Sequence, residues 1–407
     1  TFTDPLFVRS PAAGGDIVIG GGNGSGVIGN DNATLAFDAP DITLGTQIDT
    51  EGNAVYFVSE SSGNIADPGA GLGGATLADV EISDASDVDT TNGGNPAGAD
   101  VVFEDQIEGD GGLDDLTINA GDAGNVLVGV DDAGPFADLA GPGTIGQTLR
   151  IGALTIANAD NFIVAGDARV TSFSQAVTQT LTHFRGGLDA TGPVTITNAD
   201  EMLFDGTVVA ASFDQLNGLG NTTFNGADAF GLDQFDANYS NAVPTSLRTG
   251  GFANTDGGDI DINIAGDLLV ENAIISTGGE ATVLNTPCND GGAVNLSADT
   301  LDIALIHAGG SAANLSGNGG DGGAITLDAT NAVAALDLSG DLIAAGGAQA
   351  GGNTDGDAGD VTLGDAGNND AVVTLDPDAA GDAGEFTAVD DTTLIAGNDI
   401  PFNGTVD

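Results

Sequence analysis

The stretch that decides the fold is Asp256 to Leu363, where one phrase is written four times: Asp256-Gly257-Gly258-Asp259-Ile260-Asp261-Ile262, Asp290-Gly291-Gly292-Ala293-Val294-Asn295-Leu296, Asp321-Gly322-Gly323-Ala324-Ile325-Thr326-Leu327 and Asp357-Ala358-Gly359-Asp360-Val361-Thr362-Leu363. The phrases start 34, 31 and 36 residues apart. Each has an acidic residue, one or two glycines, and then a run with apolar residues at alternate positions. A period of roughly 20 to 50 residues is typical of stacked repeat architectures. We therefore expect successive coils of short β-strands, a β-solenoid in which each strand pairs with the coils before and after it.

The composition indicates a folded β protein despite its charge. Among 407 residues there are 67 glycines, 61 acidic residues and five basic ones, which gives a formal net charge of −56. Such a charge is typical of disordered chains. However, 41% of the residues are hydrophobic, and they fall in short alternating runs bounded by Gly, Asn and Asp. This is the pattern of strands and turns, so we predict an all-β fold.

The charge also limits the partners. Nucleic acid and anionic membrane surfaces would be repelled, whereas cations would be attracted. No apolar run approaches the roughly 18 residues of a membrane span, so we expect no membrane insertion. The chain starts at Thr1 without a signal-peptide pattern, which predicts a processed product or a piece of a longer protein. The single cysteine, Cys288, excludes an internal disulfide and is expected in an exposed loop.

A second repeat family lies in the middle of the chain. The run Leu154 to Asp160 recurs 40 residues later as Val194 to Asp200, and the match continues in register to Gln175 and Gln215. Each copy is expected to hold about three strands, and the β-branched stretch Ser172 to Arg185 is expected to be a strand. The repeats divide the sequence into three segments. These are an N-terminal solenoid portion at 1–145, with irregular loops expected at 59–100, a middle solenoid at 146–255 and a C-terminal solenoid at 256–407.

Both repeat families resemble bacterial surface proteins. The run Gly257 to Val270, followed by Ala273 to Gly279, is similar to the extended repeats of filamentous-haemagglutinin-type proteins, as are Ala293 to Gly310 and Ala324 to Gly347. The runs Leu154 to Gln175 and Thr392 to Val406 resemble autotransporter-associated β-strand repeats. The resemblance implies a right-handed parallel β-helix, export to the cell surface or beyond, and adhesive or structural work. Those families have no catalytic residues to carry over.

The sharpest candidate site is the column formed by Asp256, Asp290, Asp321 and Asp357. If the four phrases lie one above another, these carboxylates line one edge, and a hard cation with oxygen ligands would relieve their repulsion. The neighbouring Asp259 and Asp360 would add ligands. This predicts a calcium site, and calcium is the one cofactor we expect. The alternative is that each aspartate caps its own turn through backbone N–H groups and faces water.

Two further features carry weaker signals. The loops Gly279–Asp290, Gly309–Asp321 and Gly346–Asp357 leave the repeat at the same point, so they form either a lateral contact surface or tolerated insertions. His183 and His307 lie on apolar-patterned strands and are expected to be surface or hydrogen-bonded core residues.

These observations favour a structural role over catalysis. The first hypothesis is a secreted subunit of an extracellular filament, sheath or surface layer, because the chain begins on a strand and stops within a repeat, and head-to-tail contacts between copies make fibres. The alternative is an adhesin stalk or binding module. A polysaccharide-degrading enzyme is disfavoured, since lysine and tryptophan are absent and Arg and His are not clustered. Pairs such as Asp131-Asp132 and Asp390-Asp391 are expected by chance among 52 aspartates.

Overall fold

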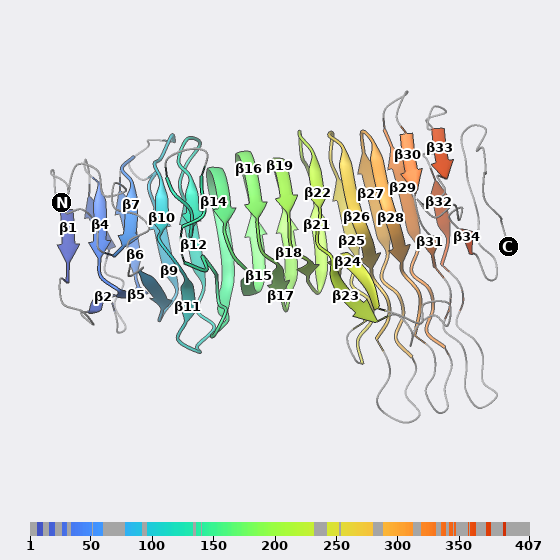
Figure 1. Ribbon diagram of the computed structural model, residues 1–407, viewed down its shortest axis with the longest axis horizontal. Helices are drawn as coiled ribbons and strands as arrows, with labels where there is room; N and C mark the ends of the chain where they lie inside the picture. Colours follow the sequence, from blue (N-terminus) through green and yellow to red (C-terminus); the bar gives the residue numbers. More distant parts are fainter. Residues whose placement is uncertain are drawn as a thin grey trace. The chain divides into compact units, whose positions relative to one another are not determined.

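The computed structural model is all-β, as predicted, and every regular element among the described residues is a strand (Figure 1). No helix long and apolar enough to span a membrane occurs in that part of the chain. The structure describes residues 6–10, 16–20, 27–30, 34–50, 52–59, 78–91, 96–132, 136–139, 141–231, 242–251, 254–279, 288–311, 319–330, 335–338, 342–344, 346, 357, 359–363, 372–375 and 386–387.

Contacts divide the chain into two compact units. Unit 1 comprises Thr1–Gly192 with Ile196–Leu203, and unit 2 comprises Pro193–Thr195 with Phe204–Asp407. The strands β18 (Pro193–Ile196) and β19 (Ala199–Phe204) lie where the chain passes from one unit to the other. The threefold division by repeat family stays a prediction about the sequence.

Unit 1 is built from three ladders of parallel strands. The first contains β1 (Leu6–Arg9), β4 (Leu35–Asp38), β7 (Val55–Val58), β10 (Val101–Phe103), β13 (Val126–Val128), the second half of β14 (Ile151–Val164) and β16 (Thr178–Phe184). The second contains β3 (Val27–Asn30), β6 (Gln47–Thr50), β9 (Ser86–Asp89), β12 (Leu116–Asn119), the first half of β14 and the second half of β15 (Ala168–Gln175). The third contains β2 (Asp16–Gly20), β5 (Asp41–Gly45), β8 (Asp79–Ile82), β11 (Ile107–Gly109), the bridging residue Ile145, the first half of β15 and β17 (Leu188–Ala190).

The chain visits these ladders in a fixed rotation. Each of the strands β1 to β10 pairs in parallel with the strand three places later, as β1 does with β4 and β2 with β5. One passage through all three ladders is termed a coil. A rotation of this kind is what short strands need, because each gains its backbone partners from the coils on either side.

Unit 2 also has three parallel ladders. Its first contains β22 (Thr222–Phe224), the first halves of β26 (Leu268–Ile275) and β28 (Leu301–His307), β30 (Ala335–Leu338) and β33 (Val372–Leu375). Its second contains β21 (Ser212–Gln215), β25 (Ile260–Asn263), β27 (Val294–Ala298), β29 (Ile325–Ala329) and β32 (Val361–Leu363). Its third contains β20 (Val208–Val209), β24 (Ala242–Arg248), the second halves of β26 and β28, β31 (Leu342–Ile343) and β34 (Phe386–Thr387). The exception is β23 (Asp228–Gly231), which is antiparallel to β24.

The core of each unit consists of like residues stacked coil on coil. In unit 1, Phe37, Phe57 and Phe103 occupy the same ladder position, and their ring centroids are 5.5 Å and 4.7 Å apart. In unit 2, Phe204 and Phe224 stack at 4.9 Å. Offset stacking at these distances adds to the burial of the rings. The alternating apolar runs in the sequence are the origin of these columns.

Three expectations about local structure need correction. The stretch Ser172 to Arg185 is split between β15 and β16, with a break at Ala176 and Val177. The region 59–100 contains two regular strands, β8 and β9, in addition to its irregular parts. Cys288 is only 7% exposed and therefore not part of an exposed loop surface.

Candidate functional site

The four repeated phrases lie in line in unit 2. The registers Ile260↔Val294, Val294↔Ile325 and Ile325↔Val361 place one phrase on each successive coil. The alignment continues into the turn, where the backbone N–H of Asp290 donates to Oδ1 of Asp256 at 3.0 Å. Asp321 donates to Asp290 at 2.8 Å and Asp357 to Asp321 at 2.9 Å in the same way. The predicted column of aspartates therefore exists.

These carboxylates join one coil to the next. The backbone completes the connection, since Gly257 N–H donates to the carbonyl of Asp290 at 2.8 Å and Gly291 N–H to that of Asp321 at 2.8 Å. We call a side chain that accepts the N–H of the equivalent residue in the next coil a coil clip. The expectation that each aspartate caps its own turn is thus wrong for Asp256, Asp290 and Asp321, because the donor lies in the next coil. The expectation that these side chains face water is confirmed, since all three residues are exposed.

The glycines of the phrase are explained by the close approach of neighbouring backbones. A Cβ on Gly323 would lie 2.0 Å from the carbonyl oxygen of Gly292, and one on Gly359 would lie 2.1 Å from that of Gly323. The preceding glycine is equally constrained, since a Cβ on Gly322 would lie 2.0 Å from the carbonyl oxygen of Ala344. Real Cβ atoms do not approach backbone oxygens this closely, so only glycine fits at these corners.

The column offers calcium few ligands within reach of one another. One oxygen of Asp256, Asp290 and Asp321 is already an acceptor for a backbone N–H, and Oδ1 of Asp259 accepts the N–H of Ala293 at 2.9 Å. Across the described residues, no group of three or more His, Cys, Asp or Glu side chains is placed to hold a metal ion. Because calcium takes six to eight oxygen ligands, the second carboxylate oxygens, turn carbonyls and water would have to complete the set. The calcium site, with Asp357 and Asp360 as its last members, stays a prediction.

Coil clips also occur outside the four phrases, where the sequence analysis missed them. In unit 1, Oδ1 of Asp100 accepts the N–H of Asn125 at 2.7 Å, and Oδ1 of Asp167 accepts that of Gly187 at 2.8 Å. In unit 2, Oδ1 of Asn221 accepts the N–H of Asp267 at 2.9 Å. Each of these acceptors stands directly before a strand or one residue from it. An Asp or Asn immediately before an apolar run is the signal that would have found them.

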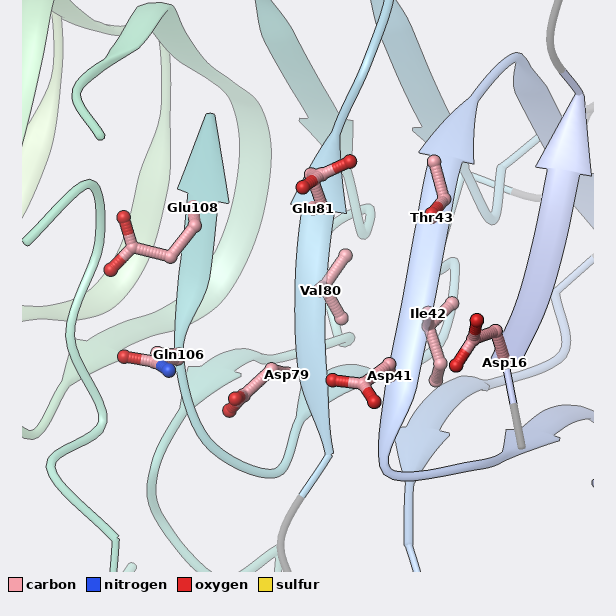
Figure 2. A pocket seen from close by; sticks show the side chains of 9 residues that line it. All are labelled: Asp16, Asp41, Ile42, Thr43, Asp79, Val80, Glu81, Gln106 and Glu108. Atoms are coloured by element: carbon pink, nitrogen blue, oxygen red, sulfur yellow. The ribbon is translucent and has the colours of Figure 1, made fainter. Parts of the chain in front are cut away.

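Unit 1 carries an acidic hollow that the sequence analysis also missed. It lies on the outward face of β2, β5, β8 and β11 and has a volume of about 440 Å³. Figure 2 shows Asp16, Asp41 and Asp79 near the starts of adjacent strands, where the register aligns them. Glu81 and Glu108 form a parallel row in register with each other. The signal was the aspartate that opens each strand before Ile or Val.

The hollow concentrates negative charge. Burial raises the pKa of Asp79, a hydrogen bond with Gln106 lowers it, and the charges of Asp41 and Glu108 raise it further. Glu108 has a structural role as well, because its carboxylate accepts the N–H groups of Thr148 at 3.0 Å and Leu149 at 2.8 Å. The chemistry that this arrangement favours is attraction of cations, since five carboxylates line the hollow.

The remaining candidate residues have structural surroundings. His307 is 2% exposed, and its Nδ1 accepts the N–H of Gly309 at 3.3 Å, as expected for a hydrogen-bonded core residue. His183 is half-buried on β16 and pairs in register with Ile163. Burial raises the pKa of the Cys288 thiol, and a hydrogen bond with Ser311 lowers it.

The loops predicted to form a ridge fall mostly outside the described residues. Their described flanks are joined, since Gly278 N–H donates to the carbonyl of Gly309 at 3.1 Å and Ser311 N–H to that of Asn289 at 3.0 Å. Of the aspartate pairs, Asp390-Asp391 also lies outside, whereas Asp132 accepts a hydrogen bond from the hydroxyl of Tyr56 at 3.0 Å.

Comparison with known proteins gave no relative. No protein-family model matches the chain, and no curated protein or solved structure shows significant similarity to it.

Proposed function

We propose that the chain is a right-handed parallel β-solenoid with a structural function outside the cell, as a subunit of a filament, sheath or surface layer. The fixed rotation through three parallel ladders in each unit supports the solenoid. The right hand is supported by the general rule that crossover connections between parallel strands of one sheet are right-handed in about 98% of cases.

One observation carries the structural role: the repeated polar residues are used to join coils. The aspartates at the head of each phrase accept N–H groups from the next coil, and the glycines permit neighbouring backbones to approach. In an enzyme, polar residues from different elements converge on one place. Here the same residue type appears once per coil, so the repeat serves the length of the stack. The extracellular location rests on the resemblance to bacterial surface proteins.

Assembly would use the edges of the ladders. A stack of parallel strands presents unpaired N–H and C=O groups wherever it stops, and such edges template pairing with another chain. We propose that copies of this chain associate head to tail through these edges. Calcium, bound along the aspartate column, would reduce the repulsion between highly acidic copies.

The second candidate is an adhesin stalk or binding module. It is favoured by the acidic hollow of unit 1, in which five carboxylates gather on an outward strand face. This function predicts a protein that stays monomeric and binds a cationic partner.

Electron microscopy and sedimentation of the purified chain separate the two functions. The measurements are made with EDTA, with calcium and with magnesium at equal ionic strength. Fibres with a regular axial repeat, or concentration-dependent oligomers, support the filament subunit. Monomers at every protein concentration, with EDTA, calcium and magnesium alike, would contradict the filament proposal and favour the binding module. A difference between calcium and magnesium, lost in Asp290→Asn together with Asp321→Asn, would support a calcium role for the column.

A further inference from the structure

A fully buried carboxylate in unit 1 holds the two ends of a long connection. Glu104, which follows β10, is 0% exposed. Its Oε2 accepts the N–H of Ser59 at 2.5 Å and the N–H of Ala78 at 3.3 Å. Ser59 follows β7 and Ala78 precedes β8, so the two donors flank the segment 60–77. The N–H of Glu104 itself donates to the carbonyl of Phe57 at 3.0 Å, which fixes the carboxylate against the end of β7.

The shared oxygen brings the two ends of this connection close together. Two nitrogens that bond one oxygen at these distances lie no more than about 6 Å apart. Consecutive Cα atoms are about 3.8 Å apart. The chain therefore leaves the coil at Ser59 and re-enters it at Ala78, at almost the same place.

The neighbouring coil makes the same corner with two residues. Its strands β4 and β5 are joined by Ala39 and Pro40 alone. These two residues meet both ends of the longer connection, because Ala39 N–H donates to the carbonyl of Val58 at 2.9 Å and Asp79 N–H donates to the carbonyl of Pro40 at 2.9 Å. The corner thus has a two-residue solution in this fold, and Ser59 with Ala78 occupies it.

We infer that the corner between β7 and β8 is complete in Ser59 and Ala78 alone, and that Glu104 is the positioning residue that holds these two residues together. The carboxylate of one coil bonds both residues in the coil before it. Stacking of β7 on β10 and of β8 on β11 then depends on this contact and not on the sequence between Ser59 and Ala78. The stability of the stack is thereby separated from the length of chain that joins the two residues, whatever the biological role of the stack.

A second corner of unit 1 follows the same rule. Thr90 is fully buried, and its hydroxyl donates to the carbonyl of Ala99 at 2.9 Å while accepting the N–H of Ala99 at 2.9 Å. It thereby closes the connection between β9 and β10. Here too a buried polar side chain holds the two ends of a connection together.

The decisive experiment deletes residues 60–77 so that Ser59 is joined directly to Ala78. We expect the deleted chain to keep the β-type circular dichroism spectrum and a cooperative transition, with a melting temperature equal to or above that of the parent, because a shorter connection costs less entropy to close. The control deletes the segment of the same length that contains β8 and β9, residues 78–95, and is expected to lose the transition of unit 1. Loss of that transition in the first deletion as well, with Glu104 intact, would overturn the inference.

Hydrogen exchange of single amides tests Glu104 in the full chain. The amides of Ser59 and Ala78 are expected to be protected in the parent. They should stay protected in Glu104→Gln, which keeps an acceptor oxygen, and exchange at least tenfold faster in Glu104→Ala. Equal protection in Glu104→Ala, with the rest of unit 1 folded, would show that Glu104 does not hold the ends.

Discussion

Replacing Asp290 separates the hydrogen bond of a coil clip from the charge that it carries. The carboxylate of Asp290 accepts the N–H of Asp321 at 2.8 Å and lies in a column between Asp256 and Asp321. Asp290→Asn keeps the acceptor oxygen and removes the charge. Asp290→Ala removes both. The two variants therefore share the loss of charge and differ by one hydrogen bond.

The two effects have similar size and opposite sign. With the carboxylates about 5 Å apart, the spacing of paired strands, each neighbour repels Asp290 by about 0.8 kcal/mol in water without salt. Screening at physiological ionic strength lowers this to about 0.4 kcal/mol per neighbour. A net hydrogen bond contributes about 1 kcal/mol. Asp290→Asn is therefore expected to stabilise unit 2, most strongly at low salt, whereas Asp290→Ala should be nearly neutral at physiological salt because its gain and loss cancel.

The assay is thermal unfolding in EDTA across a salt series. The asparagine variant should melt about 2–4 °C above the alanine variant at every salt concentration, the shift that about 1 kcal/mol produces in a domain of this size. The matched control is Asp261, an exposed residue on β25 in register with Asn295, where asparagine and alanine should melt alike. If the Asp290 variants also melt within about 1 °C of each other, coil clips do not stabilise the stack and the reasoning fails.

Further predictions concern packing, pH and calcium. Gly323→Ala should destabilise unit 2 by about 2 kcal/mol or more, because its Cβ would meet a backbone oxygen at 2.0 Å, whereas Gly111→Ala, at a φ of 97° in open space, should cost about 1 kcal/mol in urea unfolding. Phe57→Ala should cost about 3–5 kcal/mol in the same assay, since it empties the middle of a three-ring stack. Burial raises the pKa of Asp100 above its ordinary 3.8, by more than its hydrogen bonds with Asn125 lower it. Because the folded state therefore binds the proton more tightly than the unfolded state, unit 1 should gain stability as the pH falls from 7 towards 3.8. Asp100→Asn should flatten this part of the curve of melting temperature against pH. Calorimetric titration should detect calcium binding that weakens in Asp290→Asn, and equal binding by the variant would remove the column as the predicted site.

The ladders of parallel strands could be predicted from the sequence, but the contacts at the corners between the strands could not. Alternating apolar residues specify strands, and a phrase repeated at coil length specifies that they stack, so the alignment of Ile260, Val294, Ile325 and Val361 could be predicted. The break after Gln175 could not, because β-branched residues continue across it. The contacts of Glu104 could not be predicted either, since its two donors are 45 and 26 residues away in the sequence and share no pattern with it.

The geometry of the clips gives one physical reason for aspartate to be preferred in a sequence with 52 aspartates and nine glutamates. An acceptor must reach the N–H of the equivalent residue one strand spacing away, about 4.8 Å, and the short side chain of aspartate does so while its own backbone stays in the ladder. Glutamate has an additional methylene, and Glu104 uses its longer side chain to accept two N–H groups of the preceding coil, those of Ser59 and Ala78. Asparagine fits equally well and does the same work at Asn221. Hydrogen bonding alone therefore explains why the side chain is short but not why it is charged. What the charge adds is mutual repulsion between neighbouring carboxylates and an affinity for cations, which is why the salt series and the calcium titration compare aspartate with asparagine at one clip.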